Sequence, residues 1–101
     1  MKNKVLVSLV VPPSVEDALT DWLLEREEVT GFSSSRINGH GASVHSMTAA
    51  EQVAGRRAQV LFQIAIEQEL AIRLVEGVKK DFSGSGVYYW LASLLEAGHL
   101  A

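Results

Sequence analysis

Cysteine is absent from this chain of 101 residues, and the two prolines stand side by side as Pro12 and Pro13. Without cysteine no disulfide can form, and a zinc or iron–sulfur site built on thiolates is excluded. The apolar run near the start, Val5 to Val11, ends at the proline pair. A run of this length is too short for a signal-peptide core with a cleavage site or for a membrane-spanning helix. We therefore expect a cytoplasmic protein with no membrane insertion.

Positive charge is also scarce. Nine lysines and arginines stand against twelve acidic residues, which gives a formal net charge of −3. Nucleic acids and anionic membranes are bound by concentrated basic surfaces, so neither is an expected partner. The residue spacing also contains no recognisable nucleophile with a base, pair of catalytic carboxylates or open metal site. These absences favour a binding protein over an enzyme.

What the chain does contain is a strong β pattern. From Ala58 to Ile66 every second side chain is apolar, which is the period of a strand with one buried face. Val5 to Val11 is apolar on both faces, which predicts a central strand. Phe32 to Ile37 contains a run of serines and predicts a solvated edge strand. A fourth strand, rich in aromatic residues, is predicted from Val87 to Leu95.

Two segments follow the helical period instead. The first is predicted from Ser14 to about Glu27, with Ser14 as the N-cap and Asp17 in the first turn. The second is predicted from Gln68 to Asp81 and carries a glycine, which weakens it.

An unusually long loop, residues 38–55, separates the second strand from the third. In compact domains a loop of this length is more often functional than a simple connector. Its first half has two glycines and two histidines and no regular period. In its second half Thr48 and Glu51 have the spacing of a capping box, which predicts a short helix from Thr48 to Ala54 that Gly55 ends.

The element order is therefore strand, helix, strand, strand, helix, strand, and we expect residues 1–101 to form a single domain. Right-handed crossovers convert this order into an α+β, ferredoxin-like βαββαβ fold, an antiparallel sheet with two helices on one face and strands one and three in the middle. The opposite face is left open and apolar in either orientation of the strands. It carries Leu6 and Val10 or Val5, Val7, Leu9 and Val11 from the first strand, and Tyr88, Trp90 and Leu94 or Val87, Tyr89 and Leu91 from the last. Such a patch predicts a homo-oligomer packed through this face.

Several short motifs resemble those of a known superfamily. Gly31-Phe32-Ser33, Ile37 to Gly41 and Arg56 to Val60 are similar to the PII-like signalling proteins and the related CutA-like cation-tolerance proteins. A narrower resemblance, to a small PII-like family of uncharacterised bacterial proteins often encoded beside heavy-metal efflux genes, rests on Pro12-Pro13, Asp21 to Leu24, Gly31-Phe32-Ser33, Gly39-His40-Gly41 and Ala50 to Arg57.

The resemblance implies a trimeric sensor that binds a small ligand, an adenine nucleotide in PII proteins, in a cleft between subunits. Loop 38–55 would change order with the ligand and engage a partner protein. The positions that match are Gly39 and Gly41 at the loop root and Gly84 and Gly86 in the turn before the last strand, with Arg56, Arg57, Lys79 and Lys80 as basic residues nearby. Their amides and charges would bind phosphate. The turn lacks the family's lysines and the chain end lacks its paired arginines, so the ligand and any cofactor stay unassigned.

The histidines suggest metal binding as an alternative function. Neutral imidazoles of His40 and His45 suit a borderline divalent metal, with His99 or Glu96 near the chain end as further ligands. This alternative is a CutA-like metal-binding protein linked to heavy-metal tolerance or efflux. A trimer that serves only as an interaction scaffold is a third interpretation, because glycines at turns often have a purely conformational role.

Overall fold

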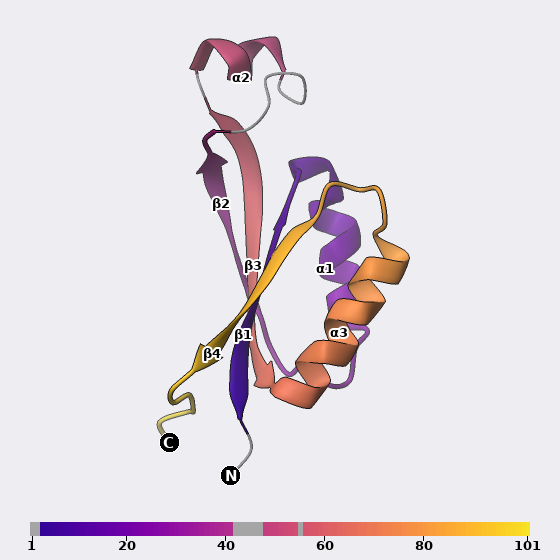
Figure 1. Ribbon diagram of the computed structural model, residues 1–101, viewed down its shortest axis with the longest axis vertical. Coiled ribbons are helices and arrows are strands. Elements are labelled where there is room, and N and C mark those ends of the chain that lie inside the picture. The colour runs from indigo at the N-terminus through magenta and orange to yellow at the C-terminus, as the bar shows by residue number, and fades with distance from the viewer. Residues whose placement is uncertain (1–2, 42–47, 55) are drawn as a thin grey trace.

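A four-stranded antiparallel sheet, covered on one face by two helices, forms the body of the protein (Figure 1). The computed structural model describes residues 3–41, 48–54 and 56–101. The strand order is β2-β3-β1-β4, which is the predicted α+β, ferredoxin-like arrangement with the first and third strands in the middle. The strands are β1 (Lys4–Val11), β2 (Ser33–Gly39), β3 (Arg57–Glu67) and β4 (Tyr88–Leu94), and the helical elements are the 3-10 turn η1 (Pro13–Val15), α1 (Glu16–Leu24), α2 (Ala49–Ala54) and α3 (Gln68–Asp81). None of the described helices combines the length and the apolar character needed to cross a membrane.

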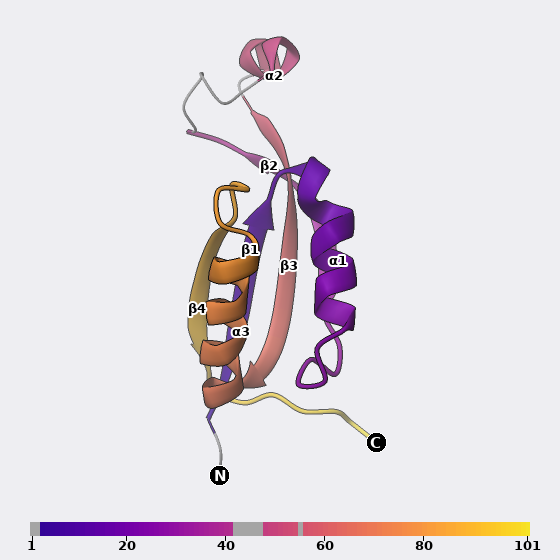
Figure 2. The same ribbon diagram turned by 90° about the vertical axis from the view of Figure 1, so that its right-hand side faces the viewer.

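Helices α1 and α3 cover one face of the sheet (Figure 2), and the hydrophobic core lies between them and the sheet. Alternation in β1 and β3 directs one apolar set from each strand toward the helices. The buried core residues are Val5, Val7, Leu9 and Val11 from β1, Val60, Phe62, Ile64 and Ile66 from β3, Leu19 and Leu23 from α1, and Ala71, Leu74, Val75 and Val78 from α3. Because burying one large apolar side chain is worth about 2 kcal/mol, this layer dominates the stability of the fold.

The start of the first helical segment differs from its prediction. Ser14 was expected to cap the helix, but it lies inside η1, and no side-chain hydrogen bond caps either η1 or α1. Pro13 occupies the first position of η1, where its fixed φ angle favours a helical turn without a cap. The helix also ends at Leu24, before the predicted Glu27, and the chain turns there through a hydrogen bond from the Arg26 amide to the Leu23 carbonyl (3.1 Å). The bounds of α3, by contrast, agree with the prediction.

Strands β2 and β3 form a hairpin that extends past the rest of the sheet. Val11 at the end of β1 pairs with Val60, so the first residues of β3 pair with β2 alone. The short helix α2 lies at the far end of this hairpin, away from α1 and α3 (Figure 1). The molecule is accordingly elongated, with principal extents of 48 × 26 × 20 Å.

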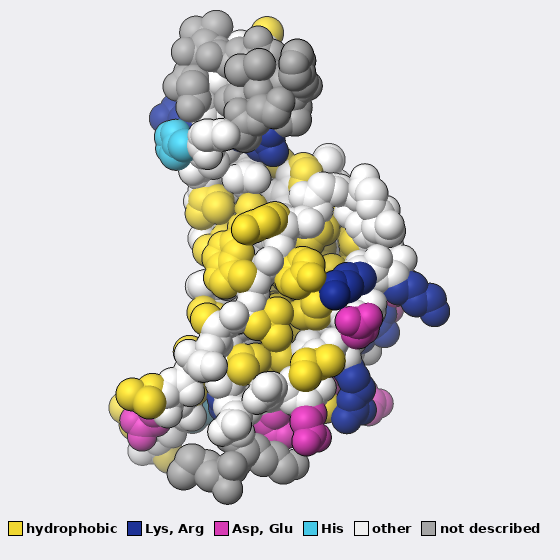
Figure 3. All heavy atoms as spheres, viewed as in Figure 1, with side chains coloured by type: hydrophobic (Ala, Val, Ile, Leu, Met, Phe, Trp, Pro, Cys, Tyr) yellow, Lys and Arg dark blue, Asp and Glu magenta, His cyan; other side chains and the backbone are white. Residues whose placement is uncertain are grey.

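The other face of the sheet, called here the open face, is covered by no described helix. Pairing of Ser8 with Trp90 places Leu6 and Val10 of β1 and Tyr88, Trp90 and Leu94 of β4 on it. Tyr88 is 67% exposed and Trp90 42% exposed, and their ring centroids are 5.8 Å apart. Hydrophobic side chains gather along β4 in Figure 3. The sequence allowed either of two sets of β1 side chains to face the helices. The structure packs Val5, Val7, Leu9 and Val11 against the helices and leaves Leu6 and Val10 on the open face.

Candidate functional site

The first half of the predicted ligand site is the root of loop 38–55, where the loop leaves β2 and joins β3. Gly39, the last residue of β2, pairs with Arg57, the first residue of β3. Gly41 has a φ of +76°, a conformation that glycine adopts without strain. A hollow of about 290 Å³, called the root hollow, is lined by Asn38, Ala50, Glu51, Arg56 and Ala58. Arg56 is therefore the predicted basic residue that contributes to its wall.

Glu51 connects the parts of this root. Its Oε1 accepts a hydrogen bond from the Thr48 amide (3.1 Å), while its own amide donates to Thr48 Oγ1 (3.1 Å), so the predicted capping box is present. Its Oε2 accepts a third bond from the Ala58 amide in β3 (2.7 Å). The bonds from the amides of Thr48 and Ala58, aided by the charge of Arg57, lower the pKa of Glu51. The carboxylate is thus held ionised between α2 and β3.

The second half of the predicted site is the turn before β4. Gly84 and Gly86 have φ angles of +78° and +85°, so both positions require glycine. A Cβ at Gly86 would also lie 3.2 Å from Cγ of Pro12, which shows that the turn packs against the end of β1. A hollow of about 210 Å³, called the turn hollow, is lined by Val78, Lys79, Phe82, Ser83, Gly84, Gly86, Val87 and Tyr89.

Lys79 carries the positive charge of the turn hollow. Its Nζ lies 5.3 Å from the ring centroid of Tyr89 and 3.5 Å from Glu76 Oε1. The contact with Tyr89 and the charge of Glu76 raise the pKa of Lys79, so the ammonium is retained at neutral pH. Lys80, the other predicted lysine, is exposed and does not line this hollow.

The root hollow and the turn hollow lie at one end of the sheet but on opposite edges. β2 and β4 are the two edge strands, separated by β3 and β1. Three interstrand spacings amount to about 14 Å. Within one chain, the structure therefore places Gly39 opposite Arg57 and Arg56 at the root hollow and, separately, Lys79, Gly84 and Gly86 at the turn hollow. It does not unite the two groups.

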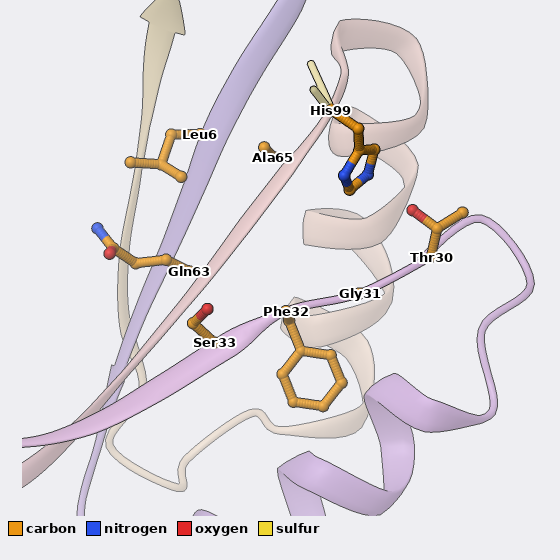
Figure 4. A pocket seen from close by; sticks show the side chains of 8 residues that line it. All are labelled: Leu6, Thr30, Gly31, Phe32, Ser33, Gln63, Ala65 and His99. Atoms are coloured by element: carbon orange, nitrogen blue, oxygen red, sulfur yellow. The ribbon is translucent and has the colours of Figure 1, made fainter. Parts of the chain in front are cut away.

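A third cavity, of about 390 Å³, was not predicted (Figure 4). This open-face pocket is lined by Leu6, Thr30, Gly31, Phe32, Ser33, Gln63, Ala65 and His99. Its polar groups are two hydroxyls, one amide and one imidazole, and no carboxylate or lysine lines it. The motif Gly31-Phe32-Ser33 was noticed in the sequence, but nothing local indicated that His99 of the chain end would lie beside it.

The histidines proposed as metal ligands lie apart where they are described. His40 follows the end of β2 at the hairpin root, whereas His99 lines the open-face pocket beside Ala65. Arg57, opposite Gly39, and Ala65 are eight residues apart in β3, or roughly 26 Å along a strand. His45 lies outside the described residues. Within residues 3–41, 48–54 and 56–101, no group of three or more His, Asp or Glu side chains is placed to hold a metal ion.

The sheet, its extended hairpin and the glycine turn together form a fold shared with PII-like proteins. CPII from Thiomonas intermedia K12, a nitrogen regulatory PII-like protein solved with ADP, AMP and bicarbonate, superposes with a TM-score of 0.70 over 97% of both chains at 18% identity. A protein from Thermus thermophilus described as PII-like and signalling gives a TM-score of 0.66 over 92% of this chain and 87% of that one, at 15% identity. The resemblance to the PII-like superfamily is confirmed, and at these identities it concerns the fold.

More narrowly, the chain belongs to the DUF3240 family, described as a protein of unknown function, whose model matches residues 1–101. A crystal structure of a DUF3240 protein from Shewanella baltica OS155 is 22% identical and superposes with a TM-score of 0.80 over 100% of both chains. No curated protein sequence matches this chain.

Proposed function

We propose that this protein is a PII-like ligand sensor. In this proposal it is a cyclic trimer that binds a small ligand of the adenine-nucleotide class between neighbouring chains, and segment 38–55 passes the state of the site to a partner protein. The observation that carries the proposal is the position of the two hollows. They share one end of the sheet but sit on opposite edges, so a ligand held between the β2 edge of one chain and the β4 edge of the next can contact both.

Cyclic assembly fits the same geometry. When the β4 edge of one chain approaches the β2 edge of the next, the interface is heterologous, and such an interface generates a ring where the rotation between chains closes. The open face supplies the apolar surface, with Tyr88 and Trp90 exposed at its β4 side. Ser8 also faces this side of the sheet, but its hydroxyl is already fully buried within the single chain, so it does not contribute to a surface for a second chain.

The chemistry of the cavities fits a nucleotide. Arg56 places positive charge at the root hollow, and Lys79 places it beside Gly84 and Gly86 at the turn hollow, which suits phosphate oxygens. The open-face pocket is not part of this proposed site, because its Ala65 lies roughly 26 Å along β3 from Arg57 at the loop root, too far for one nucleotide to reach both. The similar CPII protein was solved with ADP and AMP, which supports the same ligand class here.

Isothermal titration calorimetry with ATP, ADP and AMP tests the proposal. We expect measurable heat with at least one of them, and a roughly tenfold weaker affinity for the Arg56→Gln variant because one charged phosphate contact is lost. Arg73→Gln is the matched control, because Arg73 is exposed on α3 and lines none of the three cavities. No heat with any of the three nucleotides would remove the nucleotide proposal.

A further inference from the structure

We infer that Glu51 is a positioning residue of the proposed site, a latch that ties α2 to β3 and so holds Arg56 at the root hollow. The inference rests on the proposed function for the role of Arg56, while the latch itself rests on hydrogen bonds of the described residues. In this inference, the side chain of Glu51 links α2 to the root hollow.

Both oxygens of the Glu51 carboxylate accept hydrogen bonds. Oε1 is occupied by the Thr48 amide at the start of α2, and Oε2 by the Ala58 amide in β3. A carboxylate is acceptor-only and can satisfy two amides with two oxygens, which no neutral side chain of the same shape can do. Charge-assisted bonds of this kind are shorter and stronger than neutral ones, in agreement with the 2.7 Å distance to Ala58.

Arg56 lies inside the segment that the latch closes. Its backbone amide donates to the carbonyl oxygen of Glu51 (3.2 Å), and two residues later the Ala58 amide donates to the Glu51 carboxylate. Arg56 is therefore anchored to Glu51 through its own backbone and flanked by a second anchor. Glu51 and Arg56 also line the same hollow, so a group bound there touches the latch and the basic residue together.

Two consequences separate this latch from an ordinary helix cap. Loss of a cap alone would loosen α2, whereas loss of the latch also frees the first residues of β3 and the arginine beside them. Because the latch closes one wall of the hollow, occupancy of the hollow and order of α2 are coupled. This coupling gives loop 38–55 a physical route from ligand binding to a change in the order of α2.

The experiment compares Glu51→Gln with Glu25→Gln in the full chain. Both variants remove one negative charge, but the Glu25 side chain makes no hydrogen bond or ion pair in the described structure. Hydrogen exchange at the backbone amides of Arg56 and Ala58 is followed by NMR, and ADP affinity by calorimetry. In Glu51→Gln we expect about tenfold faster exchange at both amides and about fivefold weaker ADP binding. Glu25→Gln should behave as the wild type.

A second pair of variants distinguishes loss of the latch from a general loss of order in α2. Thr48→Ser keeps the hydroxyl that caps α2 and should leave exchange unchanged, whereas Thr48→Val removes it and should affect Glu51 more than Ala58. Unchanged exchange at Ala58 in Glu51→Gln overturns the latch, and faster exchange with unchanged ADP affinity overturns its positioning role. If the wild type binds no ADP, the proposed function and the positioning role fail together, while exchange alone still decides the latch.

Discussion

At the scale of single residues, the indole of Trp22 occupies the space between α1 and α3. Its Nε1 donates to Asp81 Oδ2 (2.7 Å), and the Arg26 guanidinium lies 3.9 Å from its ring centroid. Phe82 meets the ring edge-on at a centroid distance of 5.8 Å. With contacts on these sides, the ring has little freedom to move. A Cβ at Gly77 would lie 2.9 Å from its Cζ2 atom, so a glycine in mid-helix permits the close approach.

Gly77→Ala is expected to lower the free energy of unfolding by about 1–3 kcal/mol through overpacking. The result would be contrary to helix propensity, which favours alanine over glycine by about 1 kcal/mol. Urea unfolding at fixed protein concentration measures the change. Gly98→Ala is the control, because a Cβ there meets nothing within 4 Å. A more stable Gly77→Ala variant would show that Trp22 moves away freely.

At the scale of elements, α2 shows how a short helix is held in place. A helix of six residues is too short to be stable by itself in water. Among the described residues, its side-chain hydrogen bonds to the rest of the hairpin run through Glu51. The carboxylate is exposed, so the latch is weak enough to open. That property suits a segment proposed to respond to a ligand.

The latch should depend on pH in one direction. Because the pKa of Glu51 is lowered from its ordinary value of 4.5, the latch contributes fully above that pH and is lost as pH falls through the lowered value. We expect the NMR chemical shift of the Ala58 amide to titrate with a midpoint below 4.5. In Glu51→Gln the same amide should not titrate in this range. A midpoint at or above 4.5 in the wild type would contradict the hydrogen-bonded carboxylate.

At the scale of the whole molecule, the sheet has two unlike surfaces. One face is sealed by α1 and α3, and the other presents aromatic side chains along β4 (Figure 3). β4 is also an edge strand, and long apolar edges in soluble proteins are normally covered. β2, the other edge, has the same length of seven residues but is polar. These differences support the proposed ring, in which each chain covers the aromatic edge of its neighbour.

Trp90→Glu is therefore expected to dissociate the proposed trimer. A charge at this position would have to be buried without a partner, which is strongly unfavourable. Size-exclusion chromatography with light scattering at micromolar concentration should show a fall from three chains to one. Leu24→Glu is the control, since Leu24 is 69% exposed on α1, away from the open face. A wild-type protein that is already monomeric would contradict the assembly itself.

The elements that the sequence predicted well are those fixed by neighbours in the chain. Alternation in β3, the period of α3 and the capping box of Thr48 and Glu51 each depend on residues at most a few positions apart. The serine run similarly indicated that β2 would be an edge strand. These signals were enough to give the α+β fold and the root of the candidate site, because short-range geometry sets the period of each element.

Most of the other features of the structure depend on contacts between residues that are far apart in the sequence. Helix propensity alone makes Gly77 a weak point in α3. The structure packs Trp22, which is 55 positions earlier in the chain, against this glycine. The open-face pocket joins Leu6, Gln63 and His99, which no spacing rule connects. Ser14 is a local exception, since it had the residue type of a cap but the preceding proline opens a turn that needs none. The sequence by itself determined the elements and their order; the tertiary structure decided which faces are buried and which side chains meet, because those depend on packing across the whole fold.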